Sequence, residues 1–126
     1  MNTLSNKITI IIILYEEKEQ LVLKCLENLK NFKIIIVDNS NNLALKKLVE
    51  KNYKIFKYVL NEKNYGYSKA ANQAIKLSDT EFILMFQADG IIDPRTVSAQ
   101  ISPSITMGVL YKYFSGKFPE LALTFC

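Results

Sequence analysis

Two acidic residues stand at the ends of apolar runs, where a buried strand would deliver a carboxylate to the edge of a sheet. Asp38 ends the run KIIIVD, and Asp89 follows FILMF after two further residues. Such a carboxylate could hydrogen-bond the edge of a nucleotide base or hold a divalent cation against phosphate oxygens. The alternatives are structural: an Asx turn between Asp38 and Ser40, and a simple turn residue at Asp89.

A polar loop, NEKNYGYSKAAN, lies between these two acids in the sequence and offers further ligand groups. Its polar side chains include Asn64, Lys69 and Asn72, which could contact a ligand. Gly66 is expected to supply a backbone conformation or a close approach that a side chain would block. Lys69 could instead be a solvated lysine, and Asn72 could hydrogen-bond loop backbone.

Apolar runs alternate along the chain with segments of helical period, and this alternation predicts the strands and helices that would position these residues. The pattern predicts an α/β protein with a mostly parallel sheet and helices on both faces. After about residue 102 the apolar residues follow no clear period, so the pattern does not decide between strand and helix there. We expect a single domain over 1–126, with βα units at 7–97 and a poorly assigned segment at 98–126. The expected strands are 7–14, 33–37, 54–60 and 81–86, with helices between them and another opening at Pro94.

The ends of the four expected strands define the candidate site. In an open parallel sheet, ligands bind in the crevice beyond the carboxyl ends of the strands. No glycine-rich dinucleotide or phosphate-loop motif follows any of these strands, so those nucleotide cradles are excluded. The residues delivered to one edge would be Tyr15 to Glu17, Asp38 to Ser40, Asn61 to Tyr67 and Gln87 to Asp89.

Composition removes several function classes. The chain contains no histidine, which excludes catalytic triads and histidine-ligated zinc within it. Its net charge of +4 comes from scattered lysines and favours anionic ligands or membrane surfaces only weakly. No apolar run reaches the roughly 18–20 residues of a membrane span. We expect a cytoplasmic location, with peripheral contact to the inner face of the plasma membrane left open.

The three motifs IIIVDNS, NEKNYGYSKAANQAI and FILMFQADGIIDP, in this order, resemble a known family. They are similar to the N-terminal, nucleotide-binding half of family 2 glycosyltransferases with the GT-A fold, and most similar to rhamnosyltransferase-like members. Members of the family continue into a half that carries the acceptor site, and the 32 residues after Pro94 match none of it. Relative to the family, the chain looks truncated.

The resemblance implies roles for residues at matching positions. Asp38 would bind the base, and Tyr15 with Glu16 stands where the family has a Tyr-Asn pair lining the nucleotide. Asp89 matches the last acid of the family's Asp-x-Asp signature, which holds Mg²⁺ or Mn²⁺, and Gln87 stands at the first acid. By the same resemblance, the residues flanking the nucleotide and diphosphate would be Asn64, Gly66, Lys69 and Asn72.

The resemblance implies a donor domain that binds a UDP- or dTDP-sugar for transfer to a polysaccharide or lipid-linked acceptor. A partner chain would then supply the acceptor half, and the catalytic base is unknown. The alternative is a non-catalytic nucleotide-sugar-binding module or an inactive fragment. A phosphorelay receiver is disfavoured because Leu60 and Asn61 occupy its expected aspartate position, and no nucleic-acid partner is expected.

Overall fold

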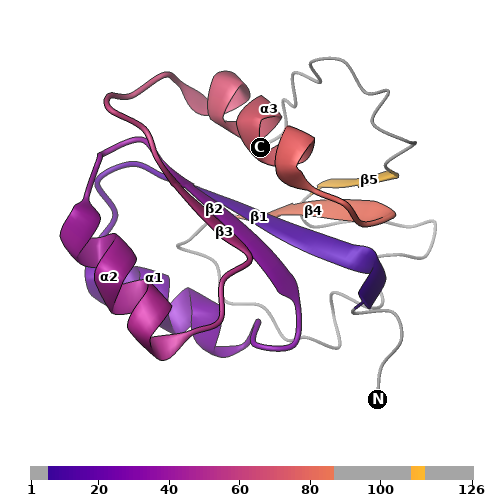
Figure 1. Cartoon of the computed structure of the whole chain (residues 1–126), viewed down its shortest axis with the longest axis horizontal. Helices are drawn as coiled ribbons and strands as arrows, with labels where there is room; N and C mark the ends of the chain where they lie inside the picture. Colours follow the sequence, from indigo (N-terminus) through magenta and orange to yellow (C-terminus); the bar gives the residue numbers. More distant parts are fainter. Residues whose placement is uncertain (1–5, 87–108, 113–126) are drawn as a thin grey trace.

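A computed structural model describes residues 6–86 and 109–112 of the chain. Five strands form one sheet in the order β3-β2-β1-β4-β5. Strands β1 to β4 are parallel, and β5 pairs antiparallel with β4 (Figure 1). The elements are β1 (Ile8–Leu14), α1 (Glu19–Glu27), β2 (Lys33–Asp38), α2 (Leu43–Asn52), β3 (Lys57–Leu60), α3 (Tyr67–Leu77), β4 (Phe82–Phe86) and β5 (Val109–Lys112).

The two central strands have apolar side chains on both faces because helices cover the sheet from both sides. Helices α1 and α2 lie on one face and α3 on the other (Figure 1). Alternate residues of β1 divide accordingly: Ile10 and Ile12 belong to the core under α1 and α2, whereas Ile11 packs with Ala70 and Ala74 of α3. The small alanine side chains let α3 approach the sheet closely. The predicted α/β architecture, with a mostly parallel sheet between helices, is confirmed.

Some predicted boundaries differ from the structure. The third strand was expected over 54–60, but β3 begins at Lys57, where pairing with Ile35 of β2 begins. Before it, Phe56 donates a backbone hydrogen bond to the Ile34 carbonyl at 2.9 Å without extending the strand. The sequence also left β5 undefined. Pro94 and the rest of segment 98–126 outside β5 lie beyond the described residues.

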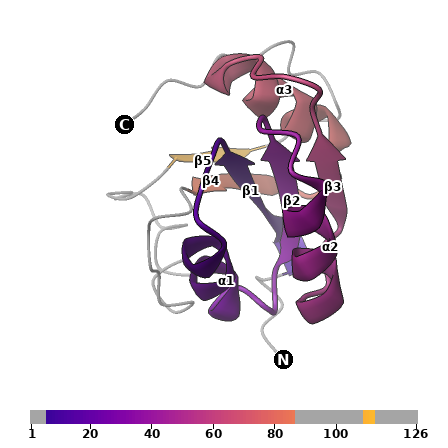
Figure 2. The same cartoon turned by 90° about the vertical axis from the view of Figure 1, so that its left-hand side faces the viewer.

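All of β1, β2 and β3 point their carboxyl ends to the same edge of the sheet (Figure 2). We call this the carboxyl edge: the strand ends at Leu14, Asp38 and Leu60 with the residues that follow them. The amino edge comprises the starts of β2 and β3, at Lys33 and Lys57, with the residues before them. Within the described ranges, none of the helices is long and apolar enough to cross a membrane.

Candidate functional site at the carboxyl edge

Backbone hydrogen bonds join the three strand ends beyond the last paired residues. The Asn39 N–H donates to the Leu14 carbonyl at 2.8 Å, which ties the end of β2 to β1. The Asn61 N–H donates to the Asp38 carbonyl at 2.9 Å and ties the end of β3 to β2. The polar side chains that follow each strand are therefore held beside one another on a fixed frame.

Asp38 lies at the centre of this edge and is fully buried. Its Oδ1 accepts hydrogen bonds from the Ser40 N–H at 2.8 Å and the Ser40 hydroxyl at 2.7 Å, which is the expected Asx turn. Its Oδ2 accepts from the Tyr58 hydroxyl at 3.3 Å. Burial of the phenol and the neighbouring Asp38 carboxylate raise the pKa of Tyr58 well above its ordinary value, so Tyr58 remains a donor.

Glu16 follows β1 in a left-handed backbone conformation, with φ of 54°. This region is uncommon for residues other than glycine, so neighbouring contacts must hold it. The Glu16 N–H donates to the Ser40 Oγ at 2.9 Å, and that hydroxyl in turn donates to Asp38. Ser40 therefore connects two of the predicted site residues. Tyr15, beside Glu16, is 48% exposed and leaves its ring accessible to a ligand.

A cluster of three amide side chains holds the loop after β3 to the end of β2. Asn61 donates through Nδ2 to Asn39 Oδ1 at 2.8 Å and to Gln73 Oε1 at 2.8 Å. Gln73, on α3, donates back to Asn61 Oδ1 at 3.0 Å. Asn39 then reaches the loop itself, with its Nδ2 donating to the Gly66 carbonyl at 3.3 Å. This amide cluster, Asn39, Asn61 and Gln73, fixes the loop against the edge that carries Asp38.

Gly66 forms the corner where the loop enters α3. Its φ is +90°, a conformation that side-chain-bearing residues rarely adopt, while a Cβ there would meet no atom within 4 Å. The glycine is therefore required for its backbone conformation and not to avoid a clash. The predicted site residue Asn64 accepts a hydrogen bond from the Gly66 N–H at 2.9 Å, which tightens the same corner.

Lys69 and Asn72 lie on the first turns of α3, which begins at this corner. The Lys69 ammonium is over the Tyr65 ring, 4.7 Å from its centroid, and its side chain is exposed. The Asn72 Oδ1 atom is buried and has no hydrogen-bond partner among the described residues. An unpaired buried acceptor carries a free-energy cost, which a donor from a ligand would remove.

Gln87 and Asp89, the remaining predicted site residues, lie outside the described residues. Within the described part, no group of three or more cysteine or acidic residues could hold a metal ion. Asp38 is fully buried, and each of its two oxygens accepts at least one hydrogen bond. Asp89 comes three positions after Phe86, the last residue of β4, and β4 lies beside β1 in the sheet.

Sequence reasoning did not single out five residues that hold the site together. Ser40 was expected only as a turn partner of Asp38 and a polar residue at a strand end, and the buried Tyr58 was expected only as part of a strand. The amides lacked a distinguishing pattern: Asn39 and Asn61 were noted only as polar strand ends, and Gln73 only as part of a helix. A detectable signal exists in hindsight, because the two asparagines each directly follow a strand.

Comparison of the sequence with protein families gives one match: the model for glycosyl transferase family 2 matches residues 9–114. This range includes the three strand ends and the loop before α3. A search of curated protein sequences gave no significant match.

Solved structures share the fold. TarS 1–349 of S. aureus superposes with a TM-score of 0.62 and 24% identity over 76% of this chain and 31% of that chain. Its complex with UDP-GlcNAc gives a TM-score of 0.58 at 24% identity, over 76% and 30% of the two chains. The mannosyltransferase PcManGT of Pyrobaculum calidifontis, solved with GDP-Man and Mn²⁺, gives 0.61 at 21% identity, over 74% and 30%. The present chain thus spans about 30% of the length of these proteins.

Proposed function

Because the chain belongs to glycosyltransferase family 2, we propose that it forms the donor-binding part of a nucleotide-sugar-dependent glycosyltransferase. The observation that carries this proposal is the bonded carboxyl edge, in which Ser40 joins Glu16 to Asp38 and the amide cluster holds the Gly66 corner beside them. The described residues thus provide a rigid frame at the position where open parallel sheets bind ligands. A preorganised site is required for catalysis by charge stabilisation.

Each predicted residue takes a role consistent with its surroundings. The Asp38 carboxylate is assigned to a base N–H through Oδ2, which among the described residues accepts only from the Tyr58 hydroxyl, and Ser40 and Tyr58 fix its orientation. Tyr15 and Glu16 line the nucleotide from the end of β1. On the loop side, Asn64 and Gly66 shape the backbone, Lys69 faces the diphosphate, and the unpaired Asn72 Oδ1 accepts a hydrogen bond from a sugar or ribose hydroxyl.

Asp89 holds Mg²⁺ or Mn²⁺ in this proposal, with Gln87 beside the donor. Mg²⁺ commonly binds through one or two protein carboxylates while phosphate oxygens and water complete its shell, so a single aspartate fits that donor set. When bound, the cation supplies charge neutralisation for the leaving nucleoside diphosphate. The solved complex of PcManGT with GDP-Man and Mn²⁺ supports this assignment by analogy of fold.

The donor is proposed to be a UDP- or dTDP-sugar, and the acceptor a polysaccharide or a lipid-linked glycan at the cytoplasmic face of the membrane. Since the chain spans about 30% of its solved relatives, acceptor binding and the catalytic base would come from elsewhere, such as a partner chain. The bonded carboxyl edge also supports a second candidate, a nucleotide-sugar-binding module without transfer activity, because no catalytic base is assigned among the described residues.

Calorimetric titration with UDP-GlcNAc and a dTDP-sugar, with Mn²⁺ and then with EDTA, tests the donor site. We expect saturable, metal-enhanced binding. Asp89→Asn should remove the metal-dependent part, and Asp38→Asn should weaken binding with or without metal. Glu27→Gln, which removes an exposed carboxylate from α1, serves as the matched control. A folded protein that binds neither donor would refute both candidates.

Release of free sugar or UDP separates the two candidates. Donor hydrolysis or transfer above the rate of the Asp89→Asn variant would establish the transferase. Tight donor binding with no turnover, also in the presence of candidate acceptors, would establish the binding module.

A further inference from the structure

A cavity of about 480 Å³ lies at the amino edge of the sheet, away from the proposed donor site. Two loops form it: the one between α1 and β2 and the one between α2 and β3. Strand β2 separates the cavity from Asp38 by its full length of six residues, which is roughly 16 Å at the usual rise per residue. A ligand in the cavity would therefore not contact the carboxyl edge. Its lining includes Lys30, Phe32, Lys33, Lys54, Ile55 and Phe56.

The walls of this amino-edge cavity are fixed by the fold. The Phe56 N–H donates to the Ile34 carbonyl at 2.9 Å, which attaches the second loop to β2. The Phe32 N–H donates to the Leu29 carbonyl at 3.1 Å, and the Phe32 side chain is buried. Phe56, by contrast, keeps 39% of its surface exposed. The cavity thus combines a rigid frame with an accessible aromatic ring, as small-molecule sites commonly do.

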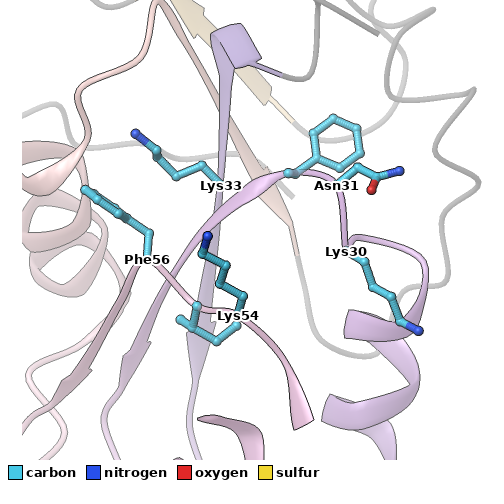
Figure 3. Close-up of a pocket in the computed structure, with 7 residues that line it drawn as sticks. Lys30, Asn31, Lys33, Lys54 and Phe56 are labelled. Atoms are coloured by element: carbon cyan, nitrogen blue, oxygen red, sulfur yellow. The ribbon is translucent and has the colours of Figure 1, made fainter. Parts of the chain in front are cut away.

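The charges that line the cavity are all positive. Lys33 pairs with Asp79 at 2.7 Å and lies 4.4 Å from the centroid of the Phe56 ring. Lys54 makes no ion pair with any described residue, and in Figure 3 its ammonium points toward Lys33 and Phe56. Lys57 lies over the same ring at 5.4 Å, whereas Lys30 points away from the cavity centre (Figure 3). Of these four lysines, Asp79 compensates only Lys33.

We propose that the amino-edge cavity binds a phosphate-bearing ligand with an apolar or aromatic body. The uncompensated Lys54 ammonium, with Lys33 also in the lining, matches the charge of a phosphate group. The exposed part of Phe56, with Ile55 and Phe32 also in the lining, matches an apolar body of limited size. A concave site of this volume admits a small molecule or a single lipid headgroup with the start of its chain, and these two sources share the same chemistry.

Phenyl phosphate is the probe for this site, because it carries both features in one soluble molecule. In the complete chain labelled with nitrogen-15, saturable shifts are expected at the backbone amides of 30–33 and 54–57. Excess UDP should leave those shifts in place, which keeps the outcome independent of the donor site. Inorganic phosphate and phenol should each bind at least about tenfold more weakly, because each lacks one half of the recognition.

Two variants assign the contacts. Lys54→Ala should weaken phenyl phosphate about tenfold, the usual loss for one charge-assisted contact. Phe56→Ala should weaken phenyl phosphate but not inorganic phosphate. Lys47→Ala, which removes an exposed lysine of α2 that does not line the cavity, is the matched control and should bind as the unaltered chain does. The proposal is overturned by absence of saturable shifts, by shifts centred elsewhere, or by equal losses in Lys47→Ala and Lys54→Ala.

Vesicle sedimentation identifies the source of the phosphate. Sedimentation with phosphatidylglycerol vesicles but not with phosphatidylcholine vesicles, lost in Lys54→Ala, would assign the cavity to an anionic lipid. Phenyl phosphate binding without such sedimentation would assign it to a soluble phosphate ester.

Discussion

The two edges of the sheet differ in how far their polar side chains are paired with one another. At the carboxyl edge, side chains bond to one another across three strand ends, from Glu16 through Ser40 to Asp38, and through the amide cluster. At the amino edge, the only ion pair among the described residues is Lys33 with Asp79, and Lys54 is exposed to solvent. These hydrogen bonds preorganise the carboxyl edge, whereas the amino edge leaves the Lys54 ammonium without an ion pair among the described residues.

Charge separates the edges as well. The described carboxyl edge carries Glu16, Glu17, Asp38 and Glu62, partly offset by Lys63 and Lys69. An anionic donor placed there gains from a divalent cation, in agreement with the proposed role of Asp89. The amino edge carries an excess of lysines and needs no cation to attract a phosphate. Substitutions of the bonded residues at the carboxyl edge should therefore lower stability more than substitutions at the amino edge do.

Asp38→Ala should have the largest effect on stability. The substitution leaves the Tyr58 hydroxyl and both Ser40 donors without their acceptor in a buried place, and a cost of about 3 kcal/mol is expected from stranded buried donors. Urea unfolding followed by circular dichroism would measure it. Glu27→Gln, on the surface of α1, should change the free energy of unfolding very little. A loss of stability in Asp38→Ala no larger than in this control would show that the Asp38 hydrogen bonds do not stabilise the fold.

Gln73→Leu should come next, because it removes one member of the amide cluster while keeping the side-chain size. Asn61 would lose both of its bonds to α3 and leave polar atoms unpaired, for an expected cost of about 2 kcal/mol. Hydrogen exchange at the Gly66 amide should accelerate along with the loss of stability. Unchanged exchange there would mean that the cluster does not hold the loop.

The amide cluster marks the limit of what the sequence could predict. The strands at 8–14 and 33–38 were predictable because they are buried on both faces and read as unbroken apolar runs. Gln73 was not, since its partner Asn61 lies at the end of another element and meets it only once α3 packs on the sheet. Likewise, Lys33 and Lys54 are distant in the sequence, which did not predict that they line the same cavity. Parallel pairing of β2 with β3 brings them together.

Tyr58→Phe should cost about 1 kcal/mol, the usual value for one lost hydrogen bond to a partner that keeps its other bonds. The variant also carries a pH signature. A folded pKa raised above the unfolded value of about 10 stabilises the protein fully below that pH, and this contribution is lost as the pH rises toward the folded pKa. Unfolding titrations above pH 10 should thus fall more steeply for the unaltered chain than for Tyr58→Phe. If the two proteins lose stability equally as the pH rises, folding does not raise the pKa of Tyr58.

Asp79→Asn should have the smallest effect on stability and so tests the comparison from the amino edge. The pair joins a partly exposed Lys33 to an exposed Asp79, and screening by solvent limits its contribution to roughly 0.5 kcal/mol or less. Removing the carboxylate also leaves the Lys33 charge uncompensated beside the cavity, so phenyl phosphate should bind about two- to fivefold more tightly, with a steeper decrease as salt is added. Titrations at two ionic strengths, with Glu27→Gln as the control for overall charge, would measure the difference. If both variants bind phenyl phosphate equally more tightly, the gain in affinity comes from net charge alone. A loss of several kcal/mol in the stability of Asp79→Asn would show that the amino edge is as tightly bonded as the carboxyl edge.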